Sequence, residues 1–235
     1  MLDLPLVLDR LSEVYGEPPP LPERGVFEWL VYENVAYLVD DARREQAYEL
    51  LRKHGAITLR GLAQVPDTVL AGVASKGILA EHQAQKLRRI ASLAQKEDLQ
   101  ALGQKPLREA KRVLMRFPSI GEPGAEKILL FARAHAVLGL DSNGVRVLTR
   151  LGLVSEGKTY AATYRQVQAL AELYRVQGID WLIRAHQMLR QHGQELCRRS
   201  RPLCERCPLT DVCLYYAGTG VAPSAAPSAD HASPR

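Results

Sequence analysis

The chain has 235 residues, of which 46% are hydrophobic, enough to bury the core of one large domain or two small ones. It contains no run of about 18 apolar residues. Its first segment carries Asp3 and Asp9, which argues against a secretory leader, so we expect a cytoplasmic protein without a membrane span. The formal net charge of +5 and a pI near 9.1 permit a polyanionic partner without requiring one.

Apolar residues recur at helical spacing almost throughout, and no segment has a convincing strand pattern, so we predict an all-α fold. In the pattern over residues 25–55, Asp40 and Asp41 are predicted to cap a helix beginning at Ala42, and Gly55 to end it. Further breaks are expected at 61–67, 77, 103–106, 118–123 and 141–144. Residues 217–235 are Pro-rich and small, and we predict a disordered tail there.

A short connection in mid-chain joins two predicted amphipathic helices, residues 106–117 and 122–135. The connection is Pro118-Ser119-Ile120-Gly121, and four residues force the helices to meet at a tight angle. Backbone N–H groups at the start of the second helix lack intrahelical partners and are suited to hold a phosphate. The alternative is a plain αα-corner that binds nothing.

A carboxylate, Asp141, follows 18 residues after Pro123. Asp141, Ser142 or Asn143 could simply be the N-cap of the helix that continues through Arg150. A carboxylate at such a helix start can also face a cleft and meet a developing positive charge.

All four cysteines fall in one short segment, with the spacing C-x6-C-x2-C-x5-C: Cys197, Cys204, Cys207 and Cys213. Four thiolates so close together can hold Zn²⁺ or a [4Fe–4S] cluster, and the ligand type does not decide between them. Disulfides are a poorer reading in a reducing compartment. The first loop carries Arg198, Arg199 and Arg201, which would form either a rigid basic patch for phosphates or a solvated charge run.

Together these motifs resemble the helix-hairpin-helix (HhH-GPD) DNA glycosylases of the endonuclease III type. The cysteine spacing matches that family's [4Fe–4S] cluster segment, and residues 117–121 match its L-P-G-[VI]-G hairpin. Leu140-Asp141, followed by Asn143 and Arg146, matches the pattern around its catalytic aspartate. The resemblance covers most of residues 25–216.

The resemblance implies a monomeric base-excision repair enzyme that acts at the nucleoid on double-stranded DNA containing a damaged or mismatched base. It implies two helical domains: a six-helix domain over residues 24–136, and a [4Fe–4S] domain built from 1–23 and 137–216. Asp141 would be catalytic, and the four cysteines would hold the cluster. The implied DNA contacts are Pro118, Ser119, Ile120, Gly121, Gly124, Arg198, Arg199, Arg201 and Asn34, the last in place of a glutamine that fills the gap left by a flipped base.

The chain also departs from the family pattern. Bifunctional members carry a lysine where this chain has Pro123, and proline has no amine to form a Schiff base with the sugar. We therefore expect a monofunctional glycosylase, as the adenine-mispair and thymine-mismatch relatives are, and AP-lyase activity is in doubt. Lys127 is the nearest other amine, either a displaced nucleophile or an exposed lysine paired with Glu126 and Glu122.

A second departure is Ser119, where the family has glycine; a positive φ there would cost serine about 1 kcal/mol. With Pro123 it keeps a rival interpretation open, that of a family member that binds damaged or structured DNA without excising a base. A third interpretation is a helical protein that is stabilised by a structural zinc ion and has no role in DNA binding.

Overall fold

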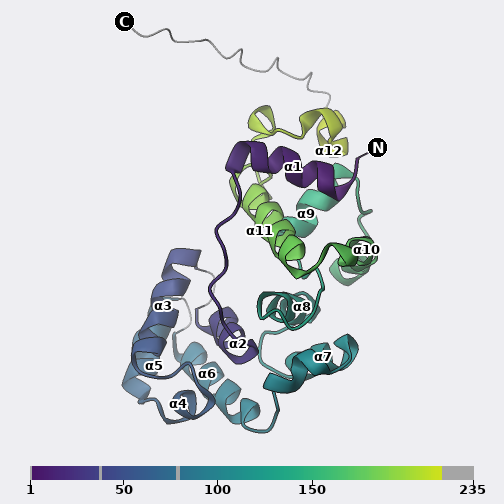
Figure 1. Ribbon diagram of the computed structural model, residues 1–235. Helices are drawn as coiled ribbons and strands as arrows, with labels where there is room; N and C mark the ends of the chain where they lie inside the picture. Colours follow the sequence, from purple (N-terminus) through teal and green to yellow (C-terminus); the bar gives the residue numbers. More distant parts are fainter. Residues whose placement is uncertain (1, 37–38, 78–79, 219–235) are drawn as a thin grey trace, which may run out of the picture. The chain divides into compact units, whose positions relative to one another are not determined.

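A computed structural model describes residues 2–36, 39–77 and 80–218. Within these ranges the chain forms helices and no strand, as predicted (Figure 1). None of the helices described is long and apolar enough to cross a bilayer. The elements in chain order are α1 (Leu4–Tyr15), α2 (Val26–Asn34), α3 (Asp41–Lys53), α4 (Leu59–Gln64), α5 (Asp67–Ala74), α6 (Ala80–Ala94), η1 (Gln100–Gln104), α7 (Leu107–Leu114), α8 (Glu122–Phe131), α9 (Ser142–Leu151), α10 (Tyr160–Leu173), η2 (Arg175–Gln177), α11 (Ile179–Glu195), η3 (Cys204–Arg206), η4 (Thr210–Val212) and α12 (Leu214–Ala217).

The chain divides into two compact units. The terminal unit comprises, among the described residues, 2–18, 142–167 and 187–218. The central unit comprises 19–141 and 168–186, so α10 and α11 contribute to both units. Residues 24–136, predicted as the six-helix domain, lie within the central unit, which also holds 137–141 and 168–186. The predicted domain boundaries stay a prediction.

The central unit is built around α2, which packs on α3, α6 and α8 (Figure 1). Further helix pairs within it are α3 with α5, α4 and α5 with α6, and α7 with α8. Their apolar faces form one buried cluster that includes Leu30, Leu87, Leu102 and Leu129. Burial of this apolar surface is the main source of the unit's stability.

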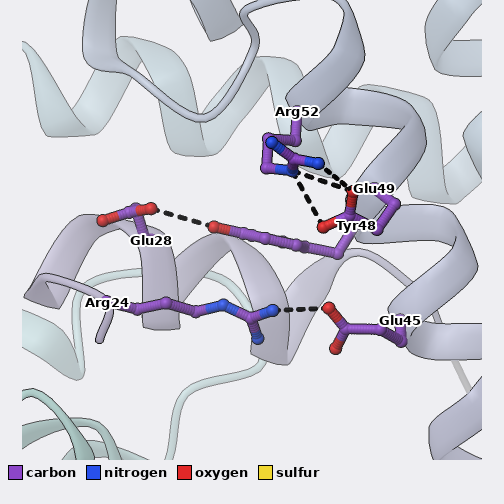
Figure 2. A network of polar contacts seen from close by, with 6 residues as sticks. All are labelled: Arg24, Glu28, Glu45, Tyr48, Glu49 and Arg52. Carbon is purple, nitrogen blue, oxygen red and sulfur yellow. Dashed lines mark hydrogen bonds and ion pairs between the residues drawn. The ribbon is translucent and has the colours of Figure 1, made fainter. Parts of the chain in front are cut away.

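One polar network ties α3 to α2 (Figure 2). The guanidinium of Arg24, just before α2, lies 4.0 Å from the ring centroid of Tyr48 on α3 and pairs with Glu45 at 2.5 Å. The Tyr48 hydroxyl donates to Glu28 Oε1 on α2 at 3.0 Å. The Arg24 side chain is only 8% exposed, so its cation–π contact and its ion pair act where water screens them little.

Local start and stop signals mostly correspond to the helices observed. Asp40 caps α3, accepting from Arg43 N at 2.8 Å, and Gly55 follows this helix with φ 68°. The predicted break over 61–67 is confirmed at Val65 and Pro66, between α4 and α5, but it begins later than predicted, because α4 runs through Gly61 and Thr58 caps that helix. A Cβ at Gly61 would overlap the carbonyl of Gly55, so this glycine serves a close backbone approach.

The terminal unit joins the first helix to the cysteine segment. Arg10 on α1 pairs with Asp211 at 2.6 Å, and the Tyr15 hydroxyl lies 3.0 Å from His192 Nδ1 on α11. The predicted disordered tail lies outside the described residues from position 219 onward.

Candidate functional site

The mid-chain connection folds as a tight hairpin between α7 and α8 in the central unit. Phe117 and Ile120 are buried and anchor the turn, while Ser119, between them, and Gly121, directly after them, are exposed. α7 ends at Leu114 and α8 at Phe131, so both helices are shorter than predicted. Arg133, with φ 56°, lies in the left-handed region and explains why α8 does not continue to His135.

Ser119 adopts the left-handed conformation that its family position suggested, with φ 59°. We expect Ser119→Gly to raise the free energy of unfolding by about 1 kcal/mol, because glycine adopts this conformation without a Cβ penalty. Urea unfolding of the two proteins measures this difference. An unchanged or lower stability would show that the serine side chain stabilises the turn in compensation.

An ion cluster centred on the buried Glu126 links the two hairpin helices. Lys111 Nζ on α7 lies 2.6 Å from Glu122 Oε1 and 2.7 Å from Glu126 Oε1, both on α8. Gln168 Nε2 donates to the same oxygen of Glu126 at 2.6 Å. Glu126 has a side chain only 2% exposed, so this carboxylate depends on its partners for compensation. No local sequence pattern marks this cluster, because its three residues meet only when α7 folds back on α8.

Pro123 is the second residue of α8, where a missing N–H costs nothing. Gly121, the N-cap, has no side chain to cap the helix. The amine nearest in sequence, Lys127, pairs with Glu33 at 2.7 Å, and its side chain is only 14% exposed. The predicted exposed pairing of Lys127 with Glu122 or Glu126 is therefore wrong, since Lys111 takes both of those carboxylates.

Asn34 does not present its amide to a ligand in this structure. Its side chain is fully buried at the end of α2, and Nδ2 donates to Leu30 O at 3.0 Å. The backbone carbonyl of Asn34 accepts a hydrogen bond from Gln83 Nε2. A residue inserted into a duplex must reach out of the protein core, so Asn34 would have to leave these contacts to fill that role, and its assignment as a DNA contact stays a prediction.

The segment that carries Asp141 is pressed against α8 through Gly139. A Cβ at Gly139 would overlap backbone atoms of Glu126 and Lys127 on α8. The carbonyl of Gly139 also lies 2.5 Å from Nδ1 of the buried His186. Only glycine permits this approach, so the fold of the central unit holds Asp141, two residues later, at a fixed place relative to the hairpin's second helix.

On the sequence-based hypothesis that Asp141 is the catalytic residue, we expect Gly139→Ala to reduce base release by about 100-fold, because the added methyl must push the segment off α8, and a displacement of about 1 Å has that effect on catalysis. Single-turnover base release measures it. Gly16→Ala, at a glycine whose Cβ would meet no atom within 4 Å but whose φ is 71°, is the control for a general loss of stability. If both variants lose the same activity, the positioning role of Gly139 is wrong.

α9 begins directly after Asp141 and is tied to the cysteine segment by one side chain. Arg146 donates from Nε to Cys197 O at 2.8 Å and from Nη2 to Gly193 O at 2.7 Å and to Asn143 Oδ1 at 2.8 Å. Gly193 on α11 lies so close to Asn143 that a Cβ added at Gly193 would be 2.8 Å from the Cβ and the backbone oxygen of Asn143. Within the terminal unit, the helix after Asp141 and the first cysteine are thus one packed element.

The four cysteines line one pocket with the apolar residues Val147, Leu151 and Leu196. Burial, with the neighbouring thiols, raises the pKa of Cys207 to about 12 and also raises the pKa of Cys204. Burial thus favours the protonated form of the Cys207 thiol, and a metal group that binds its sulfur must displace that proton. In the part of the chain that the structure describes, no three His, Cys, Asp or Glu side chains are placed to hold one metal ion.

His192 lies behind the cysteines, and burial lowers its pKa to about 4, so the ring is neutral. Its Nε2 is 3.5 Å from Cys207 Sγ, and its Nδ1 faces the Tyr15 hydroxyl. The tautomer in which Tyr15 donates to Nδ1 leaves Nε2–H to donate to the sulfur. No motif in the sequence marks His192, because the six histidines do not have a spacing that is typical of metal ligands.

The backbone carbonyl groups of the basic loop after Cys197 accept hydrogen bonds that hold the loop in place. Arg150 on α9 donates to Arg198 O at 2.8 Å, to Arg199 O at 3.2 Å and to Cys197 Sγ at 3.4 Å. Arg198, Arg199 and Arg201 are all exposed, but Arg198 Nε donates to Glu195 O at 2.9 Å, which leaves Arg199 and Arg201 to reach a ligand. The loop can therefore offer two guanidinium groups from a fixed backbone.

The amino-acid sequence of the chain is similar to those of known DNA-repair proteins. No family model matches the chain. It is 31% identical over 106 residues to endonuclease III of Rickettsia prowazekii, covering 45% of this chain and 47% of that protein. It is 28% identical over 107 residues to thymine-DNA glycosylase of Aeropyrum pernix, covering 46% and 48%. The chain thus aligns with about half the length of these relatives.

Solved structures agree in fold over nearly the whole chain. A trapped endonuclease III–DNA covalent intermediate superposes with a TM-score of 0.69 and 18% identity, covering 93% of this chain and 99% of that one. A thermostable thymine-DNA glycosylase gives 0.72 and 16%, covering 92% and 97%.

Proposed function

Because the chain belongs by fold and sequence similarity to the endonuclease III-type helix-hairpin-helix DNA glycosylases, we propose that it is a DNA N-glycosylase of base-excision repair. Its substrate is double-stranded DNA with a damaged or mismatched base, met as a monomer at the nucleoid. The observation that carries this proposal is the packing of the Asp141 segment against the hairpin helix through Gly139. It sets a carboxylate beside an element suited to hold a DNA backbone.

In this proposal the target nucleotide is rotated out of the duplex, because its glycosidic bond cannot be reached inside the stack. The negative charge of Asp141 stabilises the positive charge that develops on the sugar as the base departs with the bonding electron pair. Asp141 then accepts a proton from the water that attacks C1′. The products are the free base and an abasic site.

Backbone binding falls to two elements. The first is the hairpin, residues 118–121 with Gly124, which includes the start of α8, where no side chain caps the helix. The second is the loop of Arg199 and Arg201, with Arg198 at its base. Pro123 removes the amine that a Schiff base requires, so we propose hydrolysis without strand cleavage.

We propose that Cys197, Cys204, Cys207 and Cys213 hold a [4Fe–4S] cluster. Four thiols that line one apolar pocket are a ligand set that such a cluster uses, and their spacing in the sequence matches the cluster segment of the family that the chain resembles. When bound, such a cluster fixes the loop and can exchange an electron. Arg150 and His192 each reach a cysteine sulfur, at 3.4 Å and 3.5 Å, and would orient the ligands.

The experiment is a panel of duplexes, each with one lesion or mismatch, incubated with the protein and analysed with and without alkali. We expect strand breaks only after alkali, and no covalent adduct with abasic DNA under borohydride. An adduct that disappears in Lys127→Ala would overturn the proposal of hydrolysis alone. Binding of lesion DNA with no base release on any duplex would favour the rival function, recognition without excision, for which Pro123 and Ser119 are the motivating residues.

A further inference from the structure

A groove of about 820 Å³ opens on the terminal unit. Its walls come from one face of α9, the loop before α10 and the first residues of that helix, Arg199 of the basic loop, and α12. All of its lining residues belong to the terminal unit, so it is complete without the hairpin.

Two exposed aromatic rings line the groove, and each is supported from behind. Tyr160 is 49% exposed and stacks on the buried Tyr164, with centroids 6.1 Å apart and an interplanar angle of 20°. Tyr215 is 40% exposed and is backed by the Arg150 guanidinium, 4.4 Å from its centroid. Rings held in this way lose little freedom when a flat ligand stacks on them.

The charge of the groove favours an anion. Lys158 and Arg199 line it and are exposed, and neither forms an ion pair with any residue that the structure describes. Arg146 and Arg150 add two further positive charges while their N–H groups are held by carbonyls. Glu156 is the one carboxylate among the lining residues.

We propose that this groove is a binding site for single-stranded DNA, in which unpaired bases stack on Tyr160 and Tyr215 while Lys158 and Arg199 contact the phosphates. Exposed aromatic faces next to cations are the means by which proteins hold unpaired strands without sequence preference. A duplex hides its base faces within the stack and cannot use the two rings. The proposal goes beyond base excision and does not depend on it.

The test is fluorescence anisotropy with a labelled oligodeoxythymidylate of about 12 nucleotides, on the full chain as purified. We expect Tyr160→Ala to weaken binding about tenfold, the usual effect of removing one stacking ring, and Tyr160→Phe to retain it. Lys158→Glu should weaken binding and reduce the slope of log K against log salt concentration by about one. Lys96→Glu, the same charge change on an exposed lysine of the central unit, should have little effect.

A blunt, undamaged duplex is the second probe, and thermal unfolding verifies that each variant is folded. If Tyr160→Ala weakens single-strand and duplex binding equally, the groove is part of the duplex surface and the proposal is wrong. It is also wrong if the wild-type protein does not bind the oligonucleotide, or if Tyr160→Ala and Lys158→Glu bind it as tightly as Lys96→Glu does. Failure of base excision would leave each of these results unchanged, so the two proposals fail separately.

Discussion

Asp141→Asn is expected to lower the rate of base release by at least about 10³-fold while duplex affinity and stability change little. The residue stands directly before α9, and asparagine caps a helix start about as well as aspartate does. In the proposed mechanism the substitution removes the negative charge that meets the oxocarbenium-like sugar, together with the proton acceptor for water. Single-turnover kinetics on the duplex from which the wild type releases a base fastest measures the effect.

The matched control is Asp40→Asn, the same chemical change at the N-cap of α3, where Asp40 accepts from Arg43 N at 2.8 Å. It should leave base release unchanged. Base release by Asp141→Asn at the wild-type rate would mean that another group carries the catalysis. Equal losses in both variants would point to helix capping instead of charge.

Lys111→Met is expected to lower the free energy of unfolding by about 3–5 kcal/mol, because it leaves the buried carboxylate of Glu126 without its cation. The hairpin angle then loses its clamp, so duplex affinity should fall as well. Urea unfolding gives the stability, and anisotropy with a blunt duplex gives the affinity.

Lys105→Met provides the comparison, since Lys105 pairs with Glu109 at 2.6 Å in a position about one third exposed, and such pairs contribute about 0–1 kcal/mol. The double variant Lys111→Met with Glu126→Gln should recover much of the lost stability, because no uncompensated charge remains. If Lys111→Met costs no more than Lys105→Met, the cluster does not hold the hairpin.

The features that could be predicted from the sequence are those that depend on residues close to one another in the chain. Proline and glycine around residue 120 mark the hairpin, Asp40 marks a helix start, and helical periodicity gives the all-α fold. Each of these signals acts through neighbouring backbone groups, so a few adjacent residues suffice to recognise it.

The features that were missed depend on partners far apart in the chain. Lys111 and Glu126 meet only because α7 and α8 fold back on each other, and Lys127 pairs with Glu33, 94 positions earlier. Asn34 matched a family position in sequence, but its burial depends on packing around α2. Charge pairing among many Lys and Glu residues has no sequence period, and only the fold selects the pairs.

The contacts of α1 have a consequence for how the chain folds while it is being made. This helix is synthesised before the other helices described, yet its partners Asp211 and His192 lie 201 and 177 positions later. The central unit can form while the chain is still growing, but α1 must wait until the chain as far as Asp211 has left the ribosome. The apolar face of α1, with Leu4, Leu8 and Leu11, is therefore exposed longest during synthesis, and we expect it to be the part of the nascent chain that most needs a chaperone.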